Sequence, residues 1–346
     1  MLGTGERTRA AVRDLSPGYF ALVMASGIVS VGLGYEGFAV ASTVLLVITA
    51  AAYVLLVGLN IWRIVAYRHE VAADFASAEK GFFFYTFVAG TNVLATRLAG
   101  EHVPGVPTLL LAVSFLVWVV LGYAIPWAVV LGRQGRETLS GVNGSWFIWA
   151  VASQSIAVLA ATLEPTLPAL REALSVVAVA SWGVGLILYG IIGMSVVVRL
   201  LQHGLTPETF GPPYWVTMGA AAITVLAGSR IVEMLNTPMV DAIRGLVAGG
   251  CVVFWAFATW LIPVLVAVGW WRHGVHRVPL RYTPSLWSIV FPLGMYSVAG
   301  INLGQADRLP LVAWIGGAFL WVALAAWIVV MTATVMHVVR PYWRAR

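Results

Sequence analysis

The stretch Trp287–Ser297, WSIVFPLGMYS, places a phenylalanine, a proline and a glycine near the middle of a long apolar run. Pro292 has no backbone N–H, and its ring crowds the carbonyl of Ser288 four residues earlier. A helix here is therefore expected to bend and to lose part of its hydrogen-bond ladder. Inside a bilayer such a break is tolerated only beside other protein or a wet cavity. The bend at Pro292 therefore predicts a helix that lies beside other protein or beside a water-filled cavity.

The composition is that of an integral membrane protein. Hydrophobic residues make up 60% of the 346 residues and charged residues only 10%, whereas soluble domains carry about 25% charged residues. Crossing a hydrocarbon layer of about 30 Å takes about 20 helical residues. Ten apolar runs of this kind are expected at 17–34, 39–62, 81–98, 107–131, 144–163, 173–200, 213–235, 245–271, 284–303 and 311–338. The sequence thus predicts one membrane domain, residues 17–338, between short tails at 1–16 and 339–346.

The basic residues predict the orientation in the membrane. With the N-terminus inside, the cytoplasmic side receives 15 of the 20 Lys and Arg residues. The residues left for the other side are Arg97, Arg171, Arg230, Arg244 and Arg308. This distribution follows the positive-inside rule. It predicts a multi-pass protein of the cell membrane with both tails in the cytoplasm.

Several classes of function are disfavoured by the sequence. The formal net charge of +6 comes from arginines scattered over short loops, so no nucleic-acid partner is expected. The single Cys251 lies within the eighth run, which excludes an intramolecular disulfide and a cysteine-based metal cluster. The six histidines fall in loops or near the ends of runs, and no run carries Asp, Glu or Lys near its middle. We therefore expect no metal, no cofactor and no enzymatic activity.

The apolar runs alternate between two kinds. Odd-numbered runs carry most of the small and polar residues, whereas even-numbered runs are dominated by Leu, Val, Ile and Trp. Small residues also permit close packing in any membrane bundle. Because all five odd runs show this composition in alternation with the even runs, we favour five repeated helix hairpins. The predicted fold is all-α, with ten transmembrane helices, an inner ring of odd helices around a central pore and an outer ring of even helices. Small and polar residues expected to line that pore are Gly27, Gly90, Ser153, Gly219 and Thr224.

Five segments, one on each odd run, give a family resemblance. They read PGYFALVMASGIVSVG (17–32), FVAGTNVLATRL (87–98), NGSWFIWAVASQSIAVLA (143–160), YWVTMGAAAITVLAG (214–228) and LWSIVFPLGMYSVAG (286–300). Together and in this order they resemble the tellurite-resistance/dicarboxylate transporter family. That family includes a bacterial tellurite-resistance permease, the yeast malate and sulfite permeases and the plant slow anion channel of guard cells.

The resemblance implies a homotrimer in which each protomer encloses its own pore between five odd helices. It also implies that a phenylalanine just before the proline of the ninth helix occludes this pore. Phe291 matches that position, and Pro292 and Gly294 would bend the helix so that the ring projects into the passage. The alternative is an ordinary buried phenylalanine beside an ordinary kink.

The chemistry of the odd runs favours passage of anions over tight capture. An ion in hydrocarbon is unfavourable by about tens of kcal/mol, so it needs a wet or polarisable path. Hydroxyls, backbone dipoles and helix ends bind an anion weakly enough for release. Arg97 and Arg230, near the outer ends of the third and seventh runs, are expected to draw anions into a vestibule. Snorkelling, or pairing of Arg230 with Glu233, is the alternative.

Two functions remain open at this point. The first is a gated anion channel or facilitator for small anions such as chloride, nitrate, sulfite or malate, occluded by Phe291. The alternative is a proton-coupled C4-dicarboxylate transporter for substrates such as malate, or an exporter of sulfite or tellurite-related oxyanions. Proton relays normally use Asp, Glu or His inside the bundle. The absence of carboxylates from the middle of the runs therefore counts against proton coupling.

Overall fold

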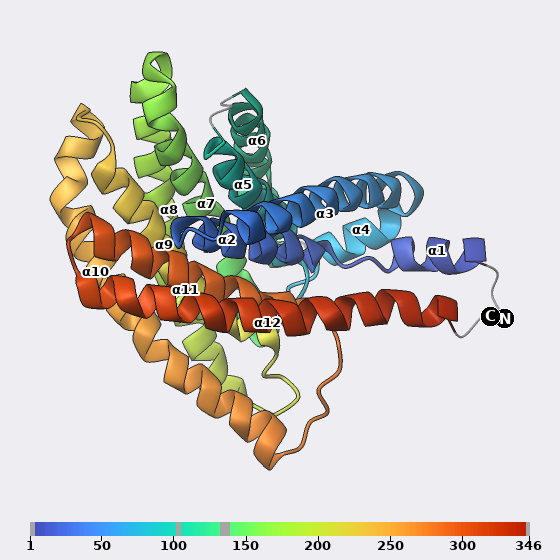
Figure 1. The fold of residues 1–346 in the computed structure, drawn as a ribbon. Coiled ribbons are helices and arrows are strands. Elements are labelled where there is room, and N and C mark those ends of the chain that lie inside the picture. Colours follow the sequence, from blue (N-terminus) through green and yellow to red (C-terminus); the bar gives the residue numbers. More distant parts are fainter. Residues whose placement is uncertain (1–3, 102–104, 132–138, 344–346) are drawn as a thin grey trace.

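The structure is a computed structural model that describes residues 4–101, 105–131 and 139–343, and every regular element within these ranges is helical (Figure 1). The odd-numbered runs share one construction, a turn of 3-10 helix followed by an α-helix. They are η1–α2 (Pro17–Tyr19, Phe20–Tyr35), η2–α5 (Gly81–Phe84, Tyr85–Ala99), η5–α7 (Gly144–Trp146, Phe147–Leu163), η8–α9 (Pro212–Trp215, Val216–Glu233) and η10–α11 (Pro284–Leu286, Trp287–Ala306).

The even-numbered runs are longer. They are α3 (Ala39–Ala66), α6 (Gly105–Pro126) with η3 (Trp127–Leu131), α8 (Arg171–His203), α10 (Pro238–Trp270) with η9 (Trp271–Val275), and α12 (Pro310–Trp343). The remaining elements are α1 (Thr4–Arg13), α4 (Arg68–Phe75), η4 (Leu139–Gly141), η6 (Glu164–Thr166) and η7 (Pro168–Leu170). All ten expected runs are therefore helical, and the predicted all-α membrane fold is confirmed.

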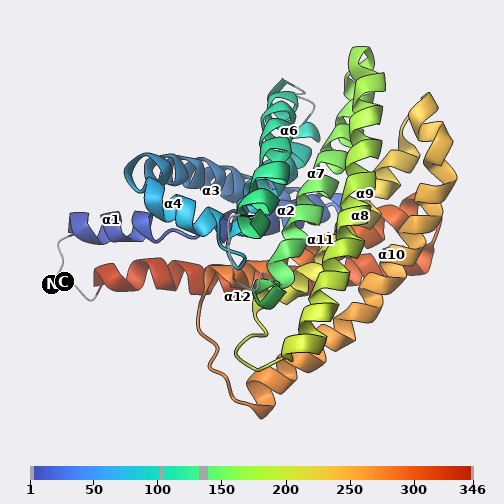
Figure 2. The same cartoon turned by 180° about the vertical axis from the view of Figure 1, so that it is seen from behind.

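The tails fall partly outside the described residues, which begin at 4 and end at 343. The expected N-terminal tail contains α1, and α12 continues to Trp343, past the end expected at 338. In both views α1 and the last turns of α12 lie at the same end of the molecule (Figures 1 and 2).

Nine of the ten runs, counted over the described residues, are long and apolar enough to cross a membrane. The exception is the third, Gly81–Ala99, whose helix carries Asn92 and Arg97. Ten of the 15 residues of α5 are buried, and all ten lie between Tyr85 and Ala95. Because neighbouring helices cover it, it does not need an apolar surface towards lipid.

Burial alternates along the chain in the same way as composition. In the apolar stretches of four odd segments, 78–89% of residues are buried inside the protein, against 17–28% in the five even segments. Figures 1 and 2 show the odd helices gathered near the middle of the molecule, with α3, α6, α8 and α10 spread around them. The small, polar helices are thus enclosed, and the Leu- and Val-rich helices form most of the surface.

The contacts between helices follow a simple order. Each odd helix packs against the even helix that follows it, which gives the pairs α2–α3, α5–α6, α7–α8, α9–α10 and α11–α12. The odd helices also contact one another in the sequence α2, α5, α7, α9, α11 and back to α2. Helices far apart in sequence, α2 and α11, thereby close the cycle. Five helix hairpins arranged in this way leave the odd helices surrounding a common axis.

In the last hairpin two α-helix backbones approach each other closely. Gly300 and Gly304 of α11 face α12, where a Cβ on Gly316 would lie 2.6 Å from the backbone nitrogen of Ile301. The same Cβ would lie 2.8 Å from the carbonyl oxygen of Ser297. Both neighbours are backbone atoms, which cannot turn away as a side chain can. Only glycine fits at position 316, as is common where membrane helices touch.

Gly316→Ala is expected to destabilise the protein by about 1–3 kcal/mol, because the added methyl overpacks the contact. Gly58→Ala on α3 is the matched control, since a Cβ there would meet nothing within 4 Å. The measurement is the thermal midpoint of unfolding in detergent. A Gly316→Ala midpoint no lower than that of Gly58→Ala would contradict this account of the contact.

Candidate functional site

A cavity lies between the odd helices and receives lining residues from all five of them. Its volume is about 20 Å³, which is room for about one water molecule. The lining residues are Ile28, Val31 and Tyr35 of α2, Asn92, Val93 and Thr96 of α5, Ser155 and Val158 of α7, Ile223, Leu226 and Arg230 of α9, and Met295 of α11. The wall is mostly apolar, with a few convergent polar groups, which is the usual character of a small-molecule or ion site.

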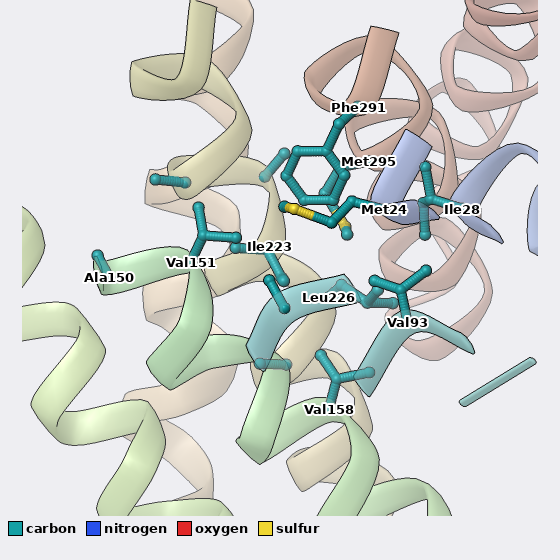
Figure 3. Packing of buried hydrophobic residues seen from close by; sticks show 14 of the residues in the cluster. Met24, Ile28, Val93, Ala150, Val151, Val158, Ile223, Leu226, Phe291 and Met295 are labelled. Atoms are coloured by element: carbon teal, nitrogen blue, oxygen red, sulfur yellow. The ribbon is translucent and has the colours of Figure 1, made fainter. Parts of the chain in front are cut away.

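Phe291 lies one helical turn before Met295 on the same face of α11. Its side chain is 1% exposed, and Figure 3 shows its ring against Met24 and Met295, in the space between the odd helices. Met24 likewise precedes the cavity-lining Ile28 by one turn of α2. Phe291 and Met24 therefore form an apolar layer next to the cavity, on the side of the helix N-termini.

Pro292 and two glycines pack around this layer. Pro292 lies inside α11, which runs from Trp287 to Ala306. A Cβ on Gly219 of α9 would lie 2.8 Å from Cγ of Pro292, and one on Gly294 would lie 2.8 Å from Cγ2 of Ile28. These glycines thus let α9 and α2 approach α11 on either side of Phe291.

Gly27 and Gly90 serve the contact between α2 and α5. A Cβ on Gly27 would lie 2.7 Å from Cγ1 of Val93, and one on Gly90 would lie 3.3 Å from the carbonyl oxygen of Phe20. None of the four glycines expected at the pore is among the described residues that line the cavity. In the structure these glycines lie in helix–helix contacts. A role for them in lining the pore stays a prediction.

Ser153 and the backbone carbonyl of Thr224 accept hydrogen bonds from tryptophans of even helices. Nε1 of Trp118 on α6 donates to Oγ of Ser153 (2.9 Å), which itself donates to the carbonyl of Trp149 (3.0 Å). The hydroxyl of Thr224 donates within its own helix to Ala220 (2.8 Å), and its carbonyl accepts from Nε1 of Trp182 on α8 (3.1 Å). Their polar atoms anchor outer tryptophans to the inner helices, because a buried indole N–H needs an acceptor.

A polar chain that the sequence did not single out reaches the cavity instead. Nδ2 of Asn92 donates to Oγ of Ser155 (2.9 Å), and Oγ of Ser114 on α6 donates to Oδ1 of Asn92 (2.6 Å). Asn92 and Ser155 both line the cavity, as does Thr96, whose buried hydroxyl has no hydrogen-bond partner. These residues belong to the polar residues of the odd runs. The composition therefore identified the polar helices, but it did not predict which of their side chains line the cavity.

The two arginines expected at a vestibule have different surroundings. Arg230 lines the cavity at the C-terminal end of α9, where Nη2 donates to the hydroxyl of Tyr35 and Nη1 pairs with Glu233 at 3.4 Å. The predicted pairing of Arg230 with Glu233 is thus present beside its place in the cavity wall. The Tyr35 contact, which the sequence gave no signal for, joins the ends of α2 and α9.

Arg97 is turned away from this cavity. Its Nε donates to the hydroxyls of Ser30 (3.1 Å) and Ser42 (3.3 Å), and its Nη1 pairs with Glu101 at 2.6 Å. These partners lie on α2, on α3 and just beyond α5. The side chain therefore ties three segments together, and a vestibule role for Arg97 remains a prediction with less geometric support than that of Arg230.

The opposite end of the odd helices has a distinct electrostatic character. The five 3-10 turns contact one another in the order η1, η2, η5, η8, η10 and back to η1. Two of them are capped by side chains, because Ser16 accepts from the N–H of Gly18 (3.2 Å) and Asn143 accepts from that of Ser145 (2.8 Å). A helix N-terminus carries about half a positive charge. Five of them gathered at one end of the bundle favour anions there.

The amino-acid sequence can be compared with those of known proteins. A family model described as a voltage-dependent anion channel matches residues 14–335. An uncharacterized membrane protein of Mycobacterium tuberculosis is 57% identical over 150 residues, which cover 43% of this chain and 76% of that relative.

Two uncharacterized transporters of Methanocaldococcus jannaschii are more distant. They are 26% and 24% identical over 201 and 197 residues, which cover 58% and 57% of this chain and 57% and 55% of those relatives. The match to the family model extends from just before η1 to the last third of α12 and so includes all five hairpins. The resemblance seen in the five odd runs is confirmed, and the chain belongs to the voltage-dependent anion channel family.

Proposed function

We propose that this protein is a gated anion channel or facilitator, with a pore between the odd helices of each protomer and Phe291 as its occluding residue. Membership of the family implies anion transport across a membrane in general terms. The finer proposal is supported by the cavity lined by all five odd helices, and by the buried Phe291 and Met24, which lie one helical turn from its lining residues Met295 and Ile28. No enzymatic role is needed to account for this arrangement.

The two sides of this layer suit an anion in different ways. On one side the cavity wall offers Asn92, Ser155 and the guanidinium of Arg230. On the other side the five helix N-termini meet. A short apolar constriction between two such regions blocks an anion by excluding the water it needs, and it conducts when it widens. Within the described part of the chain, the cavity wall includes no Asp, Glu or Lys that would repel or trap the anion.

The proposal includes the setting of the pore. The gathered N-termini of the odd helices face the cytoplasm, as do both tails, and the cavity with Arg230 opens to the outside of the cell membrane. The protein forms a homotrimer with one pore in each protomer. Small anions are the substrates, with chloride, nitrate, sulfite and malate as the candidates to measure side by side.

Proton-coupled transport of a dicarboxylate, or export of sulfite or tellurite-related oxyanions, is the competing function. Coupling requires a group that binds and releases a proton along the path. Among the described residues that line the cavity there is no Asp, Glu or His. The cavity wall thus favours uncoupled passage.

Phe291→Ala is expected to raise basal anion conductance, because removal of the ring widens the apolar constriction and lets water enter. Purified protein in planar bilayers, in chloride and then in nitrate, gives the measurement. Size-exclusion chromatography first establishes that the variant assembles as the wild type does. A variant as well assembled as the wild type but no more conductive in either anion would falsify the gate assignment.

Phe82→Ala is the matched control for that substitution. Phe82 is also 1% exposed, but its ring stacks on Trp146 at a centroid distance of 4.2 Å and does not line the cavity. Truncation of a packed phenylalanine costs about 3–5 kcal/mol, so Phe82→Ala should lower stability without a gain of current. An equal gain of current in both variants would show that general loosening, and not the position of Phe291, opens the path.

Arg230→Gln is expected to lower anion flux up to about tenfold at low ionic strength, since a charge in the cavity wall raises the local anion concentration. Arg97→Gln should change flux much less, because Arg97 does not line the cavity. Liposome flux at low and at high salt tests both, and the difference should shrink as salt screens the charge. Equal flux in the two variants and the wild type at low salt would rule out the vestibule role.

The reversal potential separates the two functions. An uncoupled channel reverses at the equilibrium potential of the anion, whatever the pH on the two sides. Currents are recorded from the Phe291→Ala variant, where they should be largest, with and without a gradient of one pH unit. If the pH gradient shifts the reversal potential at constant anion gradient, protons are coupled and the channel proposal fails.

A further inference from the structure

A pocket lies beside η8 and η10, at the end of the bundle where the 3-10 turns gather. Its volume is about 430 Å³. It is lined by Arg272 and His273 of η9, by the loop that joins η9 to η10, by Leu286 of η10 and by Pro212 of η8. Counted over the described chain, it shares no lining residue with the cavity between the odd helices. The candidate pore therefore does not account for this pocket.

The pocket carries positive charge that is not paired with a carboxylate. Arg272 and Arg281 line it, and its described lining residues include no Asp or Glu. None of the ion pairs between described residues includes either arginine. The stretch 242–306, which supplies η9, the loop and η10, contains no Asp or Glu at all. On the remaining segment, the acid closest in sequence to Pro212 is Glu208, which is exposed and does not line the pocket.

The positive-inside rule accounts for arginines at this end of the bundle, but not for arginines without partners around a pocket. At the same end Arg13, Arg63 and Lys80 each pair with a carboxylate. Within the described residues only Nε of Arg272 is enclosed without a hydrogen-bond partner, and its terminal nitrogens Nη1 and Nη2 are not enclosed. Arg281 is exposed. Both guanidinium groups therefore have N–H donors that a ligand can reach.

Hydrogen bonds hold the loop between the two arginines in one conformation. The N–H of Val278 donates to the carbonyl of Arg272 (3.1 Å), and the carbonyl of Val278 accepts from Nδ1 of His273 (2.8 Å). Arg277 has a φ of 53°, in the left-handed region that a residue other than glycine adopts only where its surroundings hold it there. The wall of the pocket is thus built before a ligand arrives, which lowers the entropic cost of binding.

We propose that this pocket binds the phosphate group of an organic phosphomonoester. A guanidinium matches phosphate oxygens with two parallel N–H donors, and a dianionic phosphate neutralises the charges of Arg272 and Arg281 together. Val278, Leu280 and Leu286 supply apolar wall for the organic body, which an inorganic anion would leave uncovered. In the proposed orientation the pocket faces the cytoplasm, and only this detail rests on the proposed function. A soluble phosphomonoester and phosphatidic acid in the membrane offer the same chemistry.

The test is isothermal titration calorimetry on the full-length protein in nanodiscs of phosphatidylcholine, with phenyl phosphate as the probe. One phenyl phosphate should bind to each chain. Inorganic phosphate should bind severalfold more weakly, because it leaves the apolar wall exposed to water. Absence of phenyl phosphate binding, or equal affinity for the two probes, would overturn the proposal.

Arg281→Gln should weaken phenyl phosphate binding about tenfold, the effect of one charge-assisted hydrogen bond. Arg277→Gln is the matched control, because Arg277 is an exposed arginine of the same loop that does not line the pocket. Both variants remove one positive charge, and size-exclusion chromatography establishes that both assemble as the wild type does. Equal loss of affinity in the two variants would show that only the general positive charge of the loop attracts the anion, and would overturn the assignment of the site.

The source of the phosphate is separated by changing the lipid of the nanodisc. If phosphatidic acid reaches the pocket, discs that contain it should raise the apparent Kd of phenyl phosphate more than discs with the same fraction of phosphatidylglycerol, which control for surface charge. An equal Kd in the two anionic discs identifies a soluble phosphomonoester as the ligand. Binding is measured without any anion flux, so failure here is distinguishable from failure of the channel proposal.

Discussion

The constraint on which this structure depends is that backbone N–H and C=O groups within a bilayer must find partners inside the protein. Helices meet this requirement along their length, but not at residues such as Pro292, nor for the polar side chains of the odd runs. Those residues need protein around them. The five even helices provide it, with 17–28% of their apolar stretches buried against 78–89% in four of the odd segments. The two layers follow from the need to shield polar helices from lipid.

The attachment between the layers uses specific contacts as well as apolar surface. Tryptophans of even helices donate to the inner helices, as Trp118 does to Ser153 and Trp327 to Ser26. These bonds turn the hydroxyls of Ser153 and Ser26 outward. Among the described residues, what remains to line the cavity is largely apolar, and its polar members are Tyr35, Asn92, Thr96, Ser155 and Arg230. The cavity is therefore lined by side chains of the odd helices that do not hydrogen-bond to the outer tryptophans.

Charge is kept to the two ends of the bundle. At one end the helix N-termini meet and the ion cluster of Arg63, Asp74 and Lys80 fixes α1 and α4 to α3. At the other end Arg230 joins α9 to α2 through Tyr35. Apart from Arg230, the described residues that line the cavity carry no fixed charge. An anion that is attracted at either end and held at neither can pass, which is the electrostatic basis of the proposed function.

The sequence by itself determined the all-α membrane fold, the ten helices to within a few residues at most ends, and the division into polar odd and apolar even runs. These follow from hydropathy and chain order, which are local. Only the tertiary structure decided that Ser153 and Thr224 serve the even helices while Asn92 and Ser155 reach the cavity, and that Arg230 lines it while Arg97 does not. Rotation of each helix about its axis settles these questions. Contacts between helices distant in sequence fix that rotation, and no single run encodes them.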